Sequence, residues 1–158
     1  MNQILIGIPV LYYTVLLGKK LVPEQNLRLV PSFFKLLIDI AGGSVIQEII
    51  FYYTHRMLHH RWFYKHFHKQ HHEWTAPISI TAMYSHPVEQ IISNFLPTSI
   101  PLLLMKSYLS TTWVYLIIKA ASTLIDHSGY HISFLNSPES HDYHHTKYET
   151  FKTLTQIT

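Results

Sequence analysis

The sequence contains no cysteine among its 158 residues, and this absence removes several classes of site at once. Disulfide bridges, thiolate zinc sites, iron–sulfur clusters and cysteine nucleophiles are all excluded. Thirteen histidines remain as the abundant side chains with affinity for transition metals. Any transition-metal site in this chain therefore has to be built mainly from imidazole.

Charge is also scarce. Only 13% of the residues are charged and 47% are hydrophobic, whereas a typical soluble domain is about a quarter charged. The formal net charge of +3 is small, and a nucleic-acid partner would need a clustered basic stripe, so none is expected. The length suits one domain, and the composition indicates that water is not the only solvent around it.

The signature motifs of several enzyme classes are missing. The sequence has no HExxH, GxSxG, GxxxxGK[ST] or GxGxxG. A zincin peptidase, hydrolysis through a nucleophile elbow, ATP-driven chemistry and an internal nicotinamide site are therefore unsupported. If the chain performs oxygen chemistry, we expect another protein to supply the reducing equivalents.

Four long apolar stretches are present, at 2–18, 33–53, 88–105 and 111–125. Each approaches the roughly 20 residues that a helix needs to cross a bilayer. We therefore predict an all-α integral membrane bundle of about four transmembrane helices, the last two forming a hairpin. Lys35, Asp39 and Lys119 interrupt these stretches and leave open a soluble protein with buried helices. We expect a membrane anchor helix and the start of the second helix in 1–44, and a histidine-rich domain in 45–158.

The histidines gather after the second and the fourth apolar stretch, at 55–72 and 127–145. If both intervening helices cross the membrane, the chain returns to the same side and the two groups can meet. Lys and Arg favour that side over the other by six to four, which indicates a cytosolic face. We predict a cytosolic helical cap that carries the histidines.

The spacing of the histidines occurs twice. An HxxxH pair precedes an HxxHH triple in each copy: His55, His59, His68, His71 and His72, then His127, His131, His141, His144 and His145. Residues three and four apart share one face of a helix. Ten imidazoles exceed the four to six ligands of one transition metal, so we predict two metal ions with about five ligands each.

The remaining histidines and the nearby carboxylates are expected to have other roles. His60 should line the site, and His66 should lie at the surface. His86 could cap the third helix. Carboxylates and histidines behind a metal site commonly orient the ligating imidazoles, and four residues are candidates for this role: His86, Glu89, Asp126 and Asp142.

Five stretches resemble the histidine boxes of the membrane fatty acid hydroxylase/sterol desaturase superfamily: THRMLHH, HKQHHEWTAP, YSHPVEQ, DHSGYH and HDYHH, over roughly 45–150. They look most like the 4-methylsterol oxidase branch. The resemblance implies a di-iron enzyme of the endoplasmic reticulum membrane that uses O2 to oxidise a C–H bond of a sterol or fatty-acyl lipid. It also implies electron supply from a membrane haem cytochrome and its NADH- or NADPH-linked reductase. Zinc is a possible occupant in purified protein.

Two departures from that branch keep other functions open. The branch has HSGYD where this chain has His131, and this chain stops thirteen residues after the last box, without a WDxLFGT-like segment. We therefore expect a fragment or short form whose activity is an open question. The alternatives are a non-catalytic metal-binding or transport protein of the membrane and a truncated pseudoenzyme that regulates its longer relatives.

Overall fold

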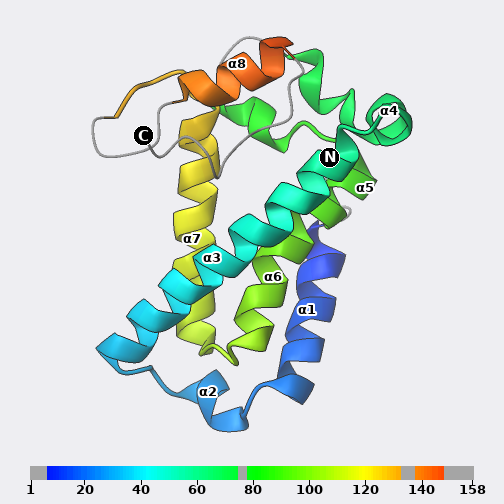
Figure 1. The fold of residues 1–158 in the computed structure, drawn as a ribbon. Helices are drawn as coiled ribbons and strands as arrows, with labels where there is room; N and C mark the ends of the chain where they lie inside the picture. Colours follow the sequence, from blue (N-terminus) through cyan, green and yellow to red (C-terminus); the bar gives the residue numbers. More distant parts are fainter. Residues whose placement is uncertain (1–6, 75–77, 133–137, 148–158) are drawn as a thin grey trace.

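The computed structural model describes residues 7–74, 78–132 and 138–147, and every regular element within them is helical. The predicted all-α class is confirmed. The long helices are α1 (Ile8–Leu21), α3 (Phe33–Leu58), α6 (Leu96–Leu104) and α7 (Leu109–Asp126), and the short α2 (Glu24–Arg28) links the first two. α3 crosses α6 and α7 obliquely, and α2 closes the lower end of the bundle (Figure 1).

The third apolar stretch is less regular than one long helix. It begins with α5 (Pro87–Glu89), continues through the π-helical segment η5 (Gln90–Phe95) and ends in α6. Prolines lie inside the last part, and because proline lacks an N–H it favours such departures from α-helical bonding. The expected hairpin is present: Lys106 turns the chain with a φ of 49°, and its carbonyl accepts a hydrogen bond of 2.8 Å from the Asn26 amide.

Polar side chains within the apolar stretches find partners inside the bundle. Lys35 pairs with the buried carboxylate of Asp39, and Lys119 on α7 lies 3.4 Å from Glu48 on α3. Tyr115 on α7 is fully buried, and its hydroxyl donates a hydrogen bond of 2.6 Å to Gln47. Lys35 and Asp39 thus pair within α3, whereas Lys119 and Tyr115 join α7 to α3.

Membrane crossing is a separate question from helical content. Among the described helices, none combines the length and the hydropathy that a bilayer span requires. The predicted transmembrane bundle is thus supported in its helices and in its histidine cap, while its membrane crossings stay a prediction.

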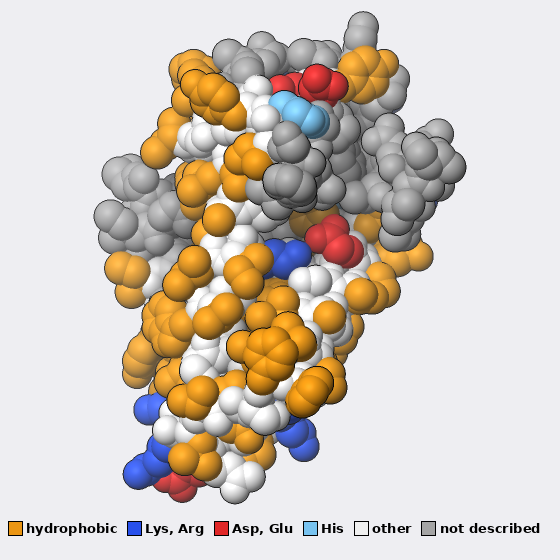
Figure 2. Space-filling view, turned by 90° about the vertical axis from the view of Figure 1, so that its left-hand side faces the viewer, with side chains coloured by type: hydrophobic (Ala, Val, Ile, Leu, Met, Phe, Trp, Pro, Cys, Tyr) orange, Lys and Arg blue, Asp and Glu red, His pale blue; other side chains and the backbone are white. Residues whose placement is uncertain are grey.

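Large hydrophobic side chains are nevertheless widely exposed on the helices. Phe34 is 76% exposed on α3, Ile117 is 66% exposed on α7, and Tyr13 is 68% exposed on α1. Orange hydrophobic side chains cover much of the lower face in Figure 2. These helices therefore turn apolar surface outward, although they also bury some of it against each other.

The histidine-bearing elements lie together at the end of the bundle opposite α2 (Figure 1). They are the last turn of α3, the π-helical turn η2 (Tyr64–His68), the 3-10 turn η3 (His71–Glu73), the end of α7 and α8 (Glu139–Lys147). The short α4 (Arg61–Phe63), which has no histidine, links α3 to η2. A further 3-10 turn, η4 (Ser79–Met83), contacts α7. The two halves of the histidine pattern therefore meet at one end of the bundle, as expected if the helices between them return the chain to the same side.

Candidate metal centre

Two histidines at the end of α3 meet a third from α8. His55 and His59 are one turn apart, with ring centroids 4.8 Å from each other, because residues four apart share a helix face. The Nε2 atom of His144 lies 3.0 Å from the Nε2 atoms of both. Phe51 stacks on His55 at 5.1 Å and covers the apolar side of that ring.

The first HxxHH triple does not lie on a regular α-helix. His68 ends the π-helical turn η2, in which the Lys69 N–H donates to the Tyr64 carbonyl at 2.9 Å, and His71 begins the 3-10 turn η3. Such π-helical turns occur frequently at functional sites. The change of helical pitch falls between His68 and His71, whose rings stack with their centroids 5.6 Å apart.

Two groups of four histidines result. The ring nitrogens within each group lie within 4.8 Å of one another. The first group is His55, His59, His68 and His144, and the second is His71, His127, His141 and His145. Each group takes three members from one half of the sequence pattern and one from the other, so neither half builds a group alone.

The second group is held largely by α8. His141 and His145 are one turn apart, with Nε2 atoms 3.0 Å from each other, and the Nε2 atom of His127 lies 2.9 Å from that of His141. The ring of His71 completes the group at 4.7 Å from the ring of His145. The three histidines of α8 thus serve both groups, because His144 faces the other one.

His72 lies between the two groups. Its Nε2 atom is 2.9 Å from that of His68 in the first group. Its ring centroid is 4.9 Å from that of His144 and 4.6 Å from that of His145 in the second. The two groups are therefore adjacent, as two ions of one dinuclear centre would be.

Hydrogen bonds from behind fix the tautomer of two members. Glu89 Oε1 lies 2.8 Å from Nδ1 of His68, and the Tyr84 carbonyl oxygen lies 3.4 Å from Nδ1 of His71. The Tyr84 carbonyl oxygen is an acceptor, so Nδ1 of His71 carries the hydrogen and Nε2 presents a lone pair to its group. Burial raises the pKa of Glu89 to about 9, and a cation bound at Nε2 of His68 would favour the Glu89 carboxylate, which accepts from Nδ1 of that ring. A carboxylate or carbonyl behind a ligating histidine is the usual support of such a ligand.

Burial keeps the histidines neutral. Desolvation, followed by repulsion from neighbouring imidazolium groups, lowers the pKa of His59 and His127 to about 4 and that of His71 and His145 to about 3. Neutral imidazole is the form that binds a metal. Two lone pairs that point at each other do not form a hydrogen bond, whereas a cation between them satisfies both. The donor set therefore fits a bound transition-metal ion in each group.

Two predicted residues lie apart from the groups. His131 is exposed and belongs to neither, so the structure leaves nine of the ten predicted ligands together. His86 caps α5, because its Nδ1 accepts a hydrogen bond of 3.2 Å from the Val88 N–H. This matches the capping role considered for it, and its ring contacts Phe67 at 5.1 Å rather than a histidine of either group.

The two aspartates differ from Glu89 in their surroundings. Asp126 is half-buried, and burial, with Glu48 as the next cause, raises its pKa to about 6. Within the described ranges, no hydrogen bond joins Asp126 to a histidine, and its charged neighbours are Glu48 and Lys119. Asp142 lies on α8 between two members of different groups and is half-buried.

The sequence does not predict the contact of the Tyr84 carbonyl with His71, because every residue has a backbone carbonyl and its residue type therefore gives no sign of this role.

A family model named Fatty acid hydroxylase matches residues 40–158. The chain therefore belongs to the fatty acid hydroxylase family, and the predicted resemblance is confirmed. The matched region contains every member of both histidine groups.

Three relatives show the range of names within this similarity. A Homo sapiens protein named Fatty acid hydroxylase domain-containing protein 2 is 48% identical over 77% of this chain and 36% of its own length. A Dictyostelium discoideum protein with the provisional name methylsterol monooxygenase is 36% identical over 92% of this chain and 57% of its own. A Very-long-chain aldehyde decarbonylase from Oryza sativa subsp. indica is 38% identical over 73% and 46%.

This chain spans about a third of the length of the first of these relatives, 36%. No solved structure matches the chain. The comparisons thus define the family, and the relatives named as hydroxylase, monooxygenase and decarbonylase differ in the reaction that their names describe.

Proposed function

We propose that this chain is an O2-dependent di-iron oxidoreductase that hydroxylates or otherwise oxidises a sterol or fatty-acyl lipid. The observation that carries the proposal is the pair of adjacent four-histidine groups with neutral rings. Iron ions in the two groups would supply the activation of O2 for oxidation of a C–H bond. The family name and the lipid-related names of the relatives support the class of substrate.

The residues of the chain hold and orient this centre. Imidazoles of both groups would bind the ions, with His72 between them. Glu89 would keep His68 in the ligating tautomer, and the Tyr84 carbonyl would do the same for His71. Nine-tenths or more of the surface of His68, His71 and His144 is buried, which keeps bulk water away from the ligands.

The apolar outer surface supports a membrane location. We propose that this is the endoplasmic reticulum membrane, with several helices in the bilayer and the histidine cap in the cytosol. Exposed side chains such as Phe34 and Ile117 would then contact lipid tails. A lipid C–H bond offers no charge to bind, so an apolar slot between helices is expected to position the substrate. Electrons would come from a membrane haem cytochrome and its NAD(P)H-linked reductase, since the sequence has no nicotinamide-binding motif.

A direct test combines oxygen uptake with lipid analysis. The purified chain is loaded with Fe(II), supplied with a chemical reductant and a lipid extract containing sterols and fatty-acyl lipids, and then exposed to O2. We expect O2 uptake coupled to a new oxygenated or desaturated lipid, and loss of both with His71→Ala. Metal binding without O2 uptake would refute the enzyme and favour the metal-binding alternative, and a chain that binds no metal would favour a regulatory pseudoenzyme.

A further inference from the structure

The segment that links α3 to the first histidine triple is strongly cationic. From residue 49 to residue 72 the sequence has no Asp or Glu, and it has four basic residues: Arg56, Arg61, Lys65 and Lys69. Arg56 donates to the Tyr52 hydroxyl at 3.2 Å. Arg61 and Lys65 form no ion pair with any acidic residue of the described ranges. Their positive charge is therefore available to a ligand.

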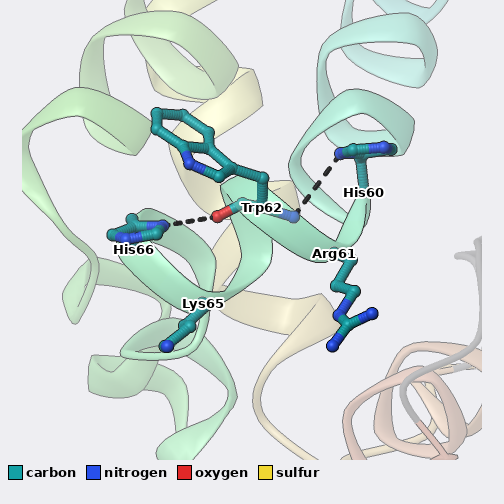
Figure 3. Close-up of a pocket in the computed structure, with 5 residues that line it drawn as sticks. All are labelled: His60, Arg61, Trp62, Lys65 and His66. Carbon is teal, nitrogen blue, oxygen red and sulfur yellow. Dashed lines mark hydrogen bonds between the residues drawn. The ribbon is translucent and has the colours of Figure 1, made fainter.

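These two cations line a small surface pocket. Its volume is about 350 Å³, and it is lined by His60, Arg61, Trp62, Lys65 and His66. Arg61 and Lys65 are one turn apart, which places them on the same face of the segment, and both extend downward from it in Figure 3. A pocket of this size with two cations suits one small anionic group rather than a broad surface.

The two histidines of the pocket are oriented by the backbone of Trp62. His60 Nδ1 accepts from the Trp62 N–H at 3.5 Å, so the other nitrogen of His60 carries a hydrogen. His66 Nδ1 lies 2.7 Å from the Trp62 carbonyl oxygen and donates to it. Figure 3 shows one ring on each side of Trp62. His60 Nε2 can therefore donate a further hydrogen bond to an anion.

Aromatic rings adjoin the cations. Trp62 is 55% exposed, with its ring 4.9 Å from Phe63 and 5.9 Å from Phe67. Aromatic residues beside Lys and Arg on one short helical segment are typical of elements that lie in a membrane surface. This combination favours a lipid headgroup over an acidic protein surface as the ligand.

The pocket and the metal centre share a segment of backbone but no side chain. His68 ends the turn that carries Lys65 and His66, yet it is fully buried and bonded to Glu89. Lys65 and His66 on the same turn are exposed. A ligand in the pocket would therefore contact the exposed side of η2. The buried side of the same turn presents His68 to the first group.

We propose that this pocket binds the phosphate group of an anionic lipid, so that α4 and η2 lie on the bilayer surface. The inference rests on the membrane location in the proposed function and adds a headgroup site that is separate from the oxidation site. Arg and Lys each form charge-assisted hydrogen bonds to phosphate oxygens. We therefore expect the loss of both to weaken binding by at least about tenfold.

The test measures binding of single lipids to the purified chain in an uncharged detergent by native mass spectrometry. The probes are dihexanoyl phosphatidic acid, dihexanoyl phosphatidylcholine and inorganic phosphate. The variant is Arg61→Ala with Lys65→Ala. The matched control, Lys19→Ala with Lys20→Ala, removes the same charge from exposed positions at the end of α1. We expect phosphatidic acid to bind more tightly than phosphatidylcholine, and a loss of at least about tenfold in the variant alone.

Several results would overturn the proposal. They are an equal loss in the Lys19/Lys20 control, equal binding of the two lipids, or displacement of phosphatidic acid by an equal concentration of inorganic phosphate. An acidic peptide whose binding depends on Arg61 and Lys65 while that of phosphatidic acid does not would assign the pocket to a protein. Iron content is measured in parallel: an unchanged value in the Arg61/Lys65 variant separates failure here from failure of the metal centre.

Discussion

The Nε2 atoms of His55 and His144 lie 3.0 Å apart, although 89 positions separate the two residues in the sequence. One belongs to the end of α3 and the other to α8. α8 has almost no apolar face of its own, since its sequence is ESHDYHHTK. Its histidines contact members of both groups, so metal binding should fix its position.

The first prediction concerns His144→Ala. This change removes the member that α8 contributes to the first group, so we expect metal affinity there to fall by at least about 100-fold, beyond the 10- to 100-fold effect of losing an outer hydrogen-bond partner. Metal per chain after dialysis, measured by mass spectrometry of the elements, reports the loss. Protease cleavage within α8 should also become faster, because only the ion of the second group would then hold that helix in place.

His131→Ala is the matched control for that experiment. His131 is exposed and lies outside both groups, so metal content and protease resistance should equal those of the unchanged chain. A loss of metal in this variant comparable to that of His144→Ala would mean that His131 is a ligand, as the repeated spacing predicts.

The repeat in the sequence predicts the set of histidines better than their grouping. HxxxH and HxxHH occur twice, and nine of the ten residues do converge. Spacing alone does not show that His71 joins the group built mainly from the second half of the pattern, or that His144 joins the group built mainly from the first. This assignment depends on the π-helical and 3-10 turns of η2 and η3. Such departures from α-helical pitch arise from tertiary contacts rather than from local residue type.

The second prediction is that Glu89→Gln weakens the metal centre without removing a ligand. In the metal-bound form the Glu89 carboxylate would accept from His68 Nδ1, which lies 2.8 Å away. The amide keeps the shape of the side chain but cannot carry that negative charge. Loss of such a partner typically lowers metal affinity about 10- to 100-fold. Competition with a chelator of known affinity gives the value.

Glu73→Gln serves as the comparison for Glu89→Gln. The Glu73 carboxylate accepts from the Tyr84 hydroxyl at 3.0 Å, so it touches no histidine of either group through that bond. Equal weakening in both variants would show that general loss of negative charge, rather than support of His68, is the cause.

The third prediction is that the metal-free chain becomes less stable in mild acid. Burial lowers the pKa of His59 and His127 from 6.5 to about 4. The unfolded chain therefore takes up protons as the pH falls below about 6.5, while the folded chain does not until about pH 4. The contribution of each such histidine to the free energy of unfolding is therefore fully present above about pH 6.5. It decreases as the pH falls from about 6.5 to about 4, by at most about 1.4 kcal/mol per pH unit.

Thermal unfolding of the metal-free chain at pH 7.5 and pH 5 tests this expectation. Burial raises the pKa of Glu89 to about 9, that of Asp126 to about 6 and that of Asp142 as well. These three carboxyl groups act in the opposite direction, but eight histidines have a lowered pKa. His59→Gln should flatten the pH dependence. A melting temperature that is equal at the two pH values in the unchanged chain would contradict the buried, neutral state of the histidines.

The helices themselves follow the apolar pattern closely, and the contacts between them do not. α3, α6 and α7 lie within or near the stretches at 33–53, 88–105 and 111–125. Lys119 interrupts the last stretch, and its partner Glu48 lies 71 positions earlier. A partner at such a distance depends on how α3 crosses α7, which periodicity within one helix does not specify.

The fourth prediction concerns the α3–α7 contact. Tyr115→Phe removes the hydroxyl that donates to Gln47 at 2.6 Å from a fully buried side chain. We expect a loss of about 1 kcal/mol in stability, seen as a lower melting temperature in detergent. Tyr130→Phe, at a position that is 76% exposed, should leave the melting temperature unchanged, and an equal shift in both variants would contradict a specific role for the hydrogen bond.

The last prediction separates the two histidine groups by stoichiometry. The unchanged chain should bind two iron ions, because its two groups of four ring nitrogens are each compact enough for one ion. His127→Ala removes a member of the second group only and should leave about one ion per chain, held by the first group. His55→Ala should likewise leave one ion in the second group. Loss of both ions in each single variant would show that the groups load only together, and one ion in the unchanged chain would exclude a dinuclear centre.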